Sequence, residues 1–448
     1  MPSARPTLTA EDAADLVGER GFGSPRVGNV GVELEWLPIR DDDPTGLVDR
    51  QRVRALAEAA GPFPERSGLT FEPGGQLELS TPPMVGIAAA CDAMQRDARH
   101  LVGALDAHGF GLIGLGLDPR PIPDRVIDEP RYAAMEAYFD SDGTAGRTMM
   151  CGTAAIQVNL DLGTPDEVDR RWRVAHSIGP TMAAAFANSP FRDATPTGWR
   201  STRLALWSVI DRARTSPVDG RDRDCRASWA RYALGAPVML VRQSDDRFVP
   251  LLRTLSFADW LNEGHELGYP TVDDLDYHLT TLFPPVRPRG WLELRMCDAV
   301  PDPWWRAAVA VTTALLDDPQ ASAEALAATS ATAGLWEAAA RRGLHDSRLA
   351  VSARACFAAA RVALDRLDVD RATIEVVDAF IDRYVLAGRC PADDLLVTWS
   401  EDGALLPEPD RFVSERRSGA SARGPGIPAG SERNHVIAAQ PPRAEDAG

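Results

Sequence analysis

The sequence predicts an α+β protein in which a sheet is flanked by helices and followed by a helical C-terminal part. Strand-like and helix-like segments are mixed up to about residue 300. They do not alternate regularly enough for a doubly wound parallel sheet, so α+β is the better class. From Asp302, with Pro303 at the first helical position, the pattern is helical to about residue 389.

The expected elements can be placed in order along the chain. Thr9 followed by Asp12 is a capping-box pattern, which starts a helix over 10–20. The other elements expected before residue 300 are strands at 30–37, 69–72 and 76–80, a helix at 84–107, a buried strand at 109–117, a strand at 149–161, helices at 165–188 and 271–282, and a strand at 290–296.

These elements predict a single domain over residues 1–413, with a mixed sheet and helix core over 1–300 and a mainly helical part over 301–390. The composition changes at about Ser414, where Gly, Pro, Ala, Ser and charged residues become dominant. Such a segment has too little apolar surface to fold by itself, so we expect 414–448 to be a disordered tail.

Charge and composition exclude several classes of function. The chain has 448 residues and a formal net charge of −17, which disfavours nucleic acid as a partner. All 48 basic residues are arginine, since the sequence contains no lysine. A Walker-type phosphate loop and a lysine Schiff base are therefore excluded. If the protein uses ATP, arginines and metal ions must neutralise its phosphates.

The cysteines and the apolar segments indicate a cytoplasmic protein. The six cysteines are scattered and include no C-x-x-C pair, so neither a zinc site nor a disulfide scaffold is indicated. Residues 1–20 contain acids where a signal peptide would be apolar. No run of about 18 apolar residues is present, so a membrane partner is not expected. The oligomeric state is left open.

Four strand-like segments carry polar residues at alternate positions. These residues are Glu33 and Glu35; Gln76, Glu78 and Ser80; Gln157, Asn159 and Asp161; and Glu293 and Arg295. A period of two places each polar set on one face of a sheet and the intervening apolar residues on the other. The face is either a functional surface or simply the wetted side of an antiparallel sheet.

The repeated carboxylates favour a metal site on that face. Alternate residues of a strand lie roughly 6–7 Å apart, so Glu33 and Glu35 could each hold a hard cation with a polyphosphate between the cations. Oxygen ligands without clustered histidines fit Mg²⁺ or Mn²⁺ better than zinc. Without a cation, the like charges would repel one another and raise the carboxylate pKa values.

Several of these segments together resemble a known family. GVELEW, FEPGGQLELS, AIQVNLD and, above all, DYHLTTLFPPVRPRGWLELR are similar to segments of the plant-type and actinobacterial glutamate–cysteine ligases. STRLALWSVIDRART and RYALGAPVMLVR add to the likeness, which covers roughly residues 25–300. The similarity is greatest to the actinobacterial enzymes that make γ-glutamylcysteine for ergothioneine.

The resemblance implies a glutamine synthetase-like fold, with a curved antiparallel sheet forming a funnel for ATP, metal ions and glutamate. It implies Mg²⁺ or Mn²⁺ ligands at Glu33, Glu35, Glu72, Glu78 and Glu293. It places Gln157 and Asn159 near substrate or nucleotide. It also makes Arg203, Arg214 and Arg295 the arginines that meet the glutamate carboxylate or the transferred phosphate. Arg287 either binds substrate or nucleotide with them or only frames its strand.

The implied activity is ATP-dependent ligation of glutamate to cysteine through γ-glutamyl phosphate, with small molecules as the partners. Val209 stands where plant relatives tend to have an acid, which leaves open a ligase of the same fold with another amine acceptor. A non-catalytic relative that binds nucleotide or metal is a third possibility. His278 is expected to be a hydrogen-bonded structural residue rather than a substrate contact.

Overall fold

The computed structural model describes residues 8–122, 124–141, 143–220, 224–244, 246–252 and 254–412, and the expected tail at 414–448 lies outside them. Its strands are β1 (Asn29–Arg40), β2 (Gly68–Phe71), β3 (Leu77–Ser80), β4 (Met84–Val85), β5 (Phe110–Ile113), β6 (Ala155–Leu160), β7 (Phe191–Arg192), β8 (Thr195–Pro196), β9 (Leu240–Ser244), β10 (Arg247–Pro250), β11 (Val286–Pro288) and β12 (Leu292–Asp298).

The helices are grouped before and after the last strand. Those before it are α1 (Ala10–Phe22), α2 (Arg50–Ala60), α3 (Gly86–Asp106), α4 (Pro130–Asp140), α5 (Ala145–Gly152), α6 (Val168–Ala185), α7 (Thr202–Ile210), α8 (Arg212–Thr215), α9 (Cys225–Gly235), α10 (Phe257–Glu263) and α11 (Val272–Thr280). Those after it are α12 (Trp304–Asp317), α13 (Pro319–Thr329), α14 (Trp336–Arg342), η1 (Gly343–His345), α15 (Ser347–Arg366), α16 (Arg371–Phe380), η2 (Ile381–Val385) and α17 (Pro391–Asp402).

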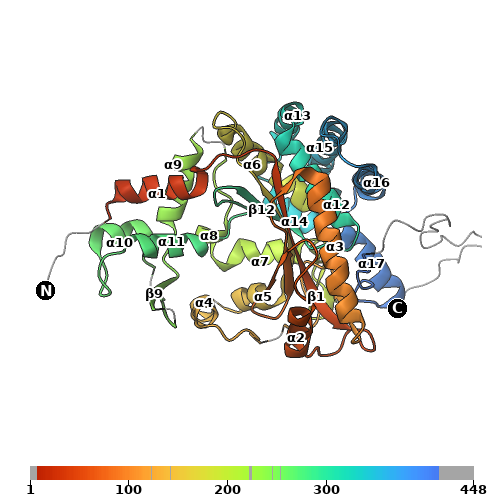
Figure 1. Cartoon of the computed structure of the whole chain (residues 1–448), viewed down its shortest axis with the longest axis horizontal. Helices are drawn as coiled ribbons and strands as arrows, with labels where there is room; N and C mark the ends of the chain where they lie inside the picture. The colour runs from red at the N-terminus through yellow and green to blue at the C-terminus, as the bar shows by residue number, and fades with distance from the viewer. Residues whose placement is uncertain are drawn as a thin grey trace, which may run out of the picture. The chain divides into compact units, whose positions relative to one another are not determined.

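The centre of the fold is an eight-stranded antiparallel sheet (Figure 1). Its main path runs β11-β12-β6-β1-β3-β2, and β4 and β5 also pair with β1. The α+β class, the antiparallel sheet and the helical C-terminal part are thus confirmed. The described residues up to Phe412 form one compact unit.

The register of the sheet brings the polar residues of separate strands together. Glu35 of β1 lies opposite Glu78 of β3, and Glu33 lies opposite Gln157 of β6. Glu293 of β12 lies opposite Asn159 of β6. Because the side-chain period of a strand is two, all these side chains project from the same face.

The other face of the sheet forms part of the main hydrophobic core. Its buried side chains include Val32, Leu34 and Trp36 of β1, Leu77 and Leu79 of β3, Ile156 and Val158 of β6, and Leu292 and Leu294 of β12. The helices α3, α6 and α12 pack against these strands, and α3 and α12 lie on one side of the sheet while α7 and α8 lie on the other (Figure 1).

Most expected elements are present, with shifted ends. The capping box of Thr9 and Asp12 starts α1, as predicted. The strand expected over 109–117 is limited to β5, and Pro303 is the residue before α12 rather than its first residue. The expected strand at 149–161 was wrong in its first part, because residues 149–152 belong to the helix α5 and the strand begins at Ala155. A short apolar run such as Met149-Met150-Cys151 has no periodicity that separates strand from helix.

A C-terminal strap, residues 403–412, follows α17 and lies against the core side of the sheet. The Asp410 carboxylate accepts hydrogen bonds from Trp36 Nε1 (3.1 Å) and from the Asp302 backbone N–H (2.9 Å). The Phe412 ring packs edge-on against Trp36, with ring centroids 5.9 Å apart. The strap therefore supports β1 on the face of the sheet opposite Glu33 and Glu35.

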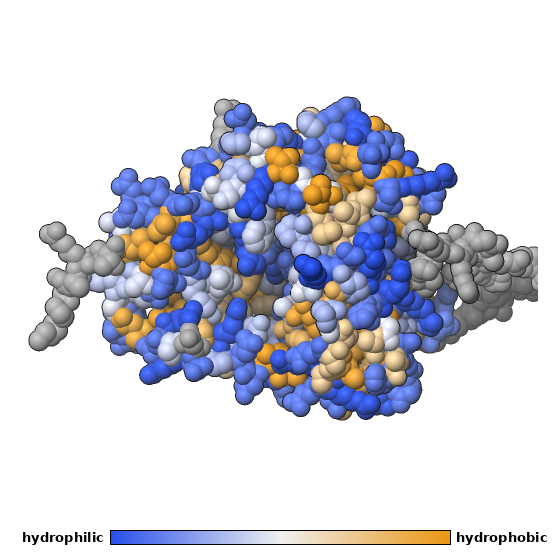
Figure 2. Space-filling model, viewed as in Figure 1, coloured by the Kyte–Doolittle hydropathy of each residue, from blue (hydrophilic) through white to orange (hydrophobic). Residues whose placement is uncertain are grey.

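Two further observations concern the surface. In the described residues, no helix combines the length and the apolar character needed to cross a bilayer. On the face drawn in Figure 2, hydrophobic residues occur in separate patches among hydrophilic ones.

Candidate active site

The polar face of the sheet forms one wall of a cavity of about 580 Å³. The acidic residues on its wall are Glu33, Glu35, Glu72, Glu78, Asp276 and Glu293, and the arginines are Arg20, Arg131, Arg203, Arg287, Arg289 and Arg295. The four strands predicted from alternation therefore line a real cavity. The wall has equal numbers of acids and arginines, but these are not evenly mixed.

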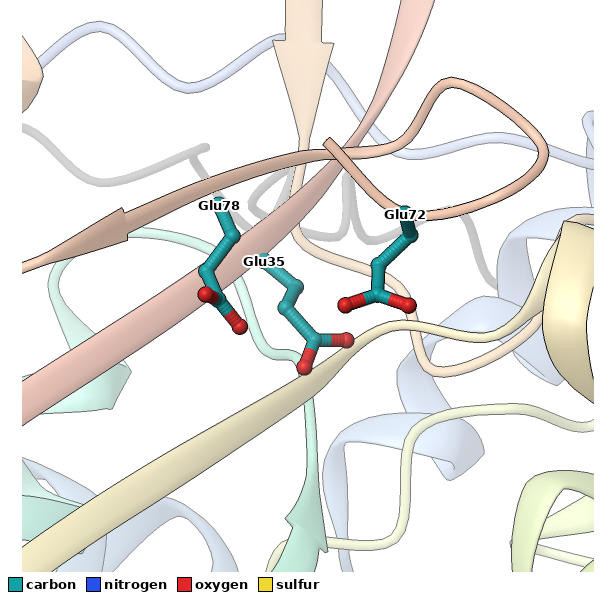
Figure 3. Close-up of side chains that lie close together, drawn as sticks. All are labelled: Glu35, Glu72 and Glu78. Carbon is teal, nitrogen blue, oxygen red and sulfur yellow. The ribbon is translucent and has the colours of Figure 1, made fainter. Parts of the chain in front are cut away.

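Three carboxylates form a cluster at one part of this wall. Glu35 from β1, Glu78 from β3 and Glu72 from the loop between β2 and β3 direct their carboxylates toward one another (Figure 3). One oxygen from each lies within 4.8 Å of the others, which is close enough for a single metal ion to contact all three. We call Glu35, Glu72 and Glu78 the carboxylate cluster.

The Glu72-Pro-Gly-Gly turn brings Glu72 to the cluster. Gly75 has a φ of +83°, a conformation that side chains disfavour. A Cβ on Gly74 would lie 2.1 Å from the Cys151 carbonyl oxygen, so only glycine allows this approach to α5. The turn is fixed further by hydrogen bonds from Gln76 Nε2 to the Thr153 carbonyl (2.9 Å) and from Arg50 Nη1 to the Gly74 carbonyl (2.8 Å).

Burial makes the ionised carboxylates of the cluster costly without a cation. It raises the pKa of Glu35 to about 8, with the Glu72 charge adding to the effect. Burial and the charge of Glu78 raise the pKa of Glu72 to about 7, and burial and Glu35 raise the pKa of Glu78 to about 7. Burial also raises the pKa of Glu33 to about 7. A bound cation would remove this cost and favour the charged forms.

The two amide side chains of β6 position the carboxylates of β1. Gln157 Nε2 donates to Glu35 at 2.9 Å and lies 3.3 Å from Glu78, while Asn159 Nδ2 donates to Glu33 at 2.8 Å. Asn159 in turn accepts a hydrogen bond from Trp291 Nε1 (2.8 Å). In this structure, both amides contact the predicted metal ligands directly.

Glu293 has a different environment from the cluster. Its carboxylate accepts hydrogen bonds from Arg287 at 2.6 and 3.0 Å, from Arg289 at 3.1 Å and from Arg295 at 3.2 Å. Burial by itself would raise its pKa, but Arg287 and Arg295 outweigh burial and hold the pKa of Glu293 well below its ordinary value. Glu293 therefore orients the arginines here, and its role as a metal ligand stays a prediction, as does that of Glu33.

Arg203 and Arg295 extend this positively charged part of the wall. Arg295 donates to Gln157 Oε1 at 2.5 Å. Arg203 is only 3% exposed and donates through Nη2 to the Arg295 carbonyl at 3.0 Å, while its Nη1 lies 3.6 Å from Asp298. Among the described residues, Arg203 Nη1 has no hydrogen-bond partner. Buried donors of this kind fit a substrate carboxylate or phosphate.

Comparisons with known proteins identify the family of this chain. Residues 29–416 match the family described as glutamate–cysteine ligase family 2 (GCS2). The chain belongs to this family. It is 45% identical over 393 residues to glutamate–cysteine ligase EgtA of Mycolicibacterium smegmatis, which covers 86% of this chain and 90% of the relative. It is 42% identical over 389 residues to glutamate–cysteine ligase EgtA of Mycobacterium tuberculosis H37Rv, which covers 85% of this chain and 88% of the relative.

A solved structure shows the same fold. The glutamate–cysteine ligase of Francisella tularensis, determined in complex with AMP, superimposes with a TM-score of 0.50 at 13% identity. The match covers 85% of this chain and 86% of the other. The family match confirms the resemblance that the sequence motifs indicated, and the superposition confirms the fold class.

Arg214 and Val209, which the sequence motifs of this chain singled out, lie outside the cavity. Arg214 is fully buried and donates to Asp211 (2.6 Å), to the Thr281 carbonyl (2.9 Å) and to the Pro237 carbonyl (2.6 Å). It holds α8 to its neighbours, and we do not include it in the proposed site. Val209 lies on the exposed side of α7, beside a separate pocket, so its side chain is not part of the cavity wall.

The sequence reasoning missed several residues of the cavity. Arg20 of α1 and Asp276 of α11 form a two-point ion pair at 2.9 and 3.2 Å, and both line the cavity. Arg131 and Tyr132 of α4 also line it. Pro130 occupies the first position of α4, and proline there is typical of a helix that begins at that residue. No local sequence pattern indicates which residues of α4 face the cavity.

Proposed function

We propose that this protein is an ATP-dependent glutamate–cysteine ligase that forms γ-glutamylcysteine, and that its product enters ergothioneine biosynthesis. Membership of glutamate–cysteine ligase family 2 and the two relatives named EgtA support this function. The observation that carries the proposal is the buried carboxylate cluster beside a set of arginines, both on one face of the antiparallel sheet.

The carboxylate cluster fits a divalent cation such as Mg²⁺ or Mn²⁺. Its ligands are all oxygens, and three of them can converge on one ion. Their pKa values are raised because burial and their mutual repulsion outweigh the nearby charge of Arg295. We propose that Glu35, Glu72 and Glu78 hold one cation and that Glu33 and Glu293 contribute to a second. When bound, such cations neutralise the polyphosphate and hold its terminal phosphate in place.

The proposed reaction has two steps. The γ-carboxylate of glutamate attacks the γ-phosphorus of ATP, giving γ-glutamyl phosphate and ADP. The amine of cysteine then attacks the acyl carbon, forms the amide and releases phosphate. The transferring phosphoryl group spreads negative charge over its oxygens, so positioning and electrostatic stabilisation supply most of the catalysis.

The arginines of the cavity would supply that stabilisation. We assign Arg295 to the transferred phosphate, because it lies between Glu293 and Gln157 on the sheet face. Arg203 would bind a carboxylate of glutamate through Nη1, which forms no hydrogen bond within the described part of the chain and is 3.6 Å from Asp298. Glu293 keeps the guanidinium groups of Arg287 and Arg295 in place through its hydrogen bonds. Arginine is required for these roles because the chain contains no lysine.

An assay of ADP release tests the proposal. With ATP, glutamate and Mg²⁺ supplied, cysteine should stimulate release far more than other amino acids, and γ-glutamylcysteine should accumulate in equal amount. Better turnover with another amine would favour a ligase with a different acceptor. Release that depends on no amine and no glutamate would contradict both versions.

The alternative acceptor has little structural support. Val209 raised that possibility, but it lies outside the cavity wall, so its difference from the plant relatives does not change the surface that a substrate would contact. The non-catalytic alternative is also weakened, because all five glutamates are present and three of them form the carboxylate cluster.

A further inference from the structure

Two arginines and one aspartate lie in the interior behind the turn that carries Glu72. They are Arg50 at the start of α2, and Asp118 and Arg120 in the segment after β5. All three are buried, and none of them lines the cavity. One carboxylate therefore faces two guanidinium groups away from solvent, although taking charges out of water is costly. The chemistry proposed for the cavity makes no use of these three residues.

The carboxylate of Asp118 is already satisfied by Arg120. Arg120 Nε and Nη2 donate to its two oxygens at 2.9 and 2.8 Å, which is the two-point geometry of a strong arginine–carboxylate pair. Arg50 adds one longer hydrogen bond, from Nη2 to the same carboxylate at 3.2 Å. The second guanidinium is thus not needed to neutralise Asp118, so the role of Arg50 lies in its other hydrogen bond.

The other hydrogen bond of Arg50 holds the turn that carries Glu72. Arg50 Nη1 donates to the Gly74 carbonyl at 2.8 Å, two residues after Glu72. The Arg50 side chain also packs against the turn, since a Cβ on Gly75 would lie 3.1 Å from Arg50 Cβ. The guanidinium group of Arg50 therefore connects the turn to Asp118.

Glu72 is the member of the carboxylate cluster whose position depends most on such a contact. Glu35 and Glu78 lie on paired strands, and the hydrogen bonds between these strands fix their backbones. Glu72 lies after the end of β2 (Figure 3), in a turn whose Gly74 and Gly75 have no side chains to pack. When the cluster is ionised without a cation, the charge of Glu78 repels Glu72. A hydrogen bond to the turn has to oppose this repulsion if the three carboxylates are to stay together.

We propose that Arg50 is a positioning residue: oriented by Asp118, it holds Glu72 where the carboxylate cluster binds its cation. The inference rests on the proposed function, which places that cation at the cluster. Mg²⁺ demands near-ideal geometry, so a small displacement of one ligand weakens its binding. Loss of a group that orients a metal ligand typically costs about 10–100-fold in metal affinity.

Mn²⁺ binding to the full-length protein tests this role without catalysis. Mn²⁺ is the probe because the electron paramagnetic resonance signal of the free ion reports its concentration. In the folded protein, Arg50→Gln should raise the Kd of Mn²⁺ by about tenfold or more. A purely electrostatic effect has the opposite sign, because removing a positive charge favours a cation. An unchanged or lower Kd would overturn the proposal.

Arg120→Gln is the matched control. It removes the same charge beside the same Asp118, but the other acceptors of Arg120 are the Pro38 and Pro44 carbonyls rather than the turn. Its Kd for Mn²⁺ should stay within about twofold of the parental value, even if its melting temperature falls. An equal rise of the Kd in both variants would show a general loosening of the fold and contradict a specific role of Arg50.

Arg50→Lys serves as the second variant if Arg50→Gln does not fold. It keeps the positive charge, but a single ammonium group does not reproduce the two arms of the guanidinium fork that reach Gly74 and Asp118. The Kd of Mn²⁺ should therefore rise in this variant as well, and a parental Kd would overturn the proposal.

A double variant shows whether Arg50 acts through Glu72. Glu72→Gln removes a proposed ligand and should by itself raise the Kd of Mn²⁺. If Arg50 positions Glu72, adding Arg50→Gln to Glu72→Gln should change the Kd by less than about twofold, because both changes remove the same interaction. A further rise of about tenfold would show that the two residues act independently, which would overturn the proposal.

The outcomes separate this inference from the function on which it rests. If Glu72→Gln raises the Kd and Arg50→Gln does not, the metal site stands and Arg50 does not position it. If the parent and Glu72→Gln bind Mn²⁺ equally, the carboxylate cluster is not the metal site and the positioning role fails with it. ADP release by the parent with glutamate and cysteine decides the ligase function separately.

Discussion

At the residue scale, the site contains two kinds of buried carboxylate. Glu35, Glu72 and Glu78 have pKa values raised to about 7–8 by burial, whereas arginines hold the pKa of Glu293 below its ordinary value. Burial outweighs the nearby arginine charges at the first kind, whereas Glu293 is hydrogen-bonded to three arginines. Similar residues on one sheet face should therefore respond in opposite ways to the loss of their charge.

The first prediction uses this contrast. In the metal-free protein at pH 8, Glu35→Gln should leave the melting temperature unchanged or raised. The raised pKa of Glu35 means that the folded protein loses stability as the pH increases toward 8, and the variant has no carboxylate there to ionise. Glu293→Gln should lower stability by about 3 kcal/mol or more, because three arginines lose a charged partner. Both should reduce ligation by at least about 100-fold.

Calorimetry and the ADP assay measure these effects. Glu375→Gln is the control, since Glu375 pairs with Arg371 on the surface and should contribute little to either property. A Glu35→Gln protein with parental ligation would show that this carboxylate is only part of a wetted sheet face.

The second prediction concerns His278, which is buried and lies 2.8 Å from the Ala233 carbonyl through Nε2. Burial lowers its pKa to about 4, so the folded state keeps it neutral. Its stability contribution is complete above about pH 6.5 and declines as the pH falls toward 4, because only the unfolded chain binds the proton there. His278→Gln should therefore reduce the loss of stability between pH 7 and pH 5 by up to about 2 kcal/mol.

Denaturant titrations at the two pH values test the effect of His278. The control variant is His100→Gln, because His100 is exposed. Its free energy of unfolding should change between the two pH values as that of the parent does. Equal pH dependence in His278→Gln and the parent would mean that His278 is protonated in the fold, which its buried position argues against.

At the element scale, alternation in the sequence predicted β1, β3, β6 and β12 because a period of two can be read within a single strand. It could not predict that Glu35 lies opposite Glu78, since register depends on contacts between distant segments. It also missed that Met149 and Met150 belong to a helix, and that α4 brings Tyr132 to the cavity. Arg214 was assigned to an anion from its motif alone, although its donors are used within the protein.

The third prediction concerns the C-terminal strap. Truncation after Phe412 should leave activity and melting temperature nearly unchanged, because the residues beyond it have few apolar side chains to bury. Truncation after Gly403 also removes Asp410 and Phe412 and so exposes Trp36 behind β1. We expect this second variant to lose about 3 kcal/mol or more of stability.

Thermal denaturation of the two truncated proteins separates the strap from the tail. The second variant should also bind Mg²⁺ and ATP more weakly, because β1 carries Glu33 and Glu35 on its other face. Equal stability of both truncated proteins would show that the strap does not support the sheet.

At the scale of the whole molecule, an acidic chain without lysine has to bind an anionic nucleotide. The net charge of −17 repels ATP at a distance, so attraction has to be local. The arginines around Glu293 provide part of it, and cations at the carboxylate cluster would provide the rest. Nucleotide binding should consequently require the metal ion.

The last prediction tests that dependence through linkage. A ligand that binds only the folded chain at 100 times its Kd stabilises it by about 2.7 kcal/mol, so Mg²⁺ and ATP together should raise the melting temperature of the parent clearly. ATP with EDTA should not, because the cluster then adds repulsion to the negative charge of the phosphates. The double variant Glu35→Gln, Glu78→Gln should show little increase with Mg²⁺ and ATP, and excess Mg²⁺ should restore ligation to the EDTA-treated parent but not to the variant. An equal increase in parent and variant would place the cation elsewhere and remove the carboxylate cluster from the mechanism.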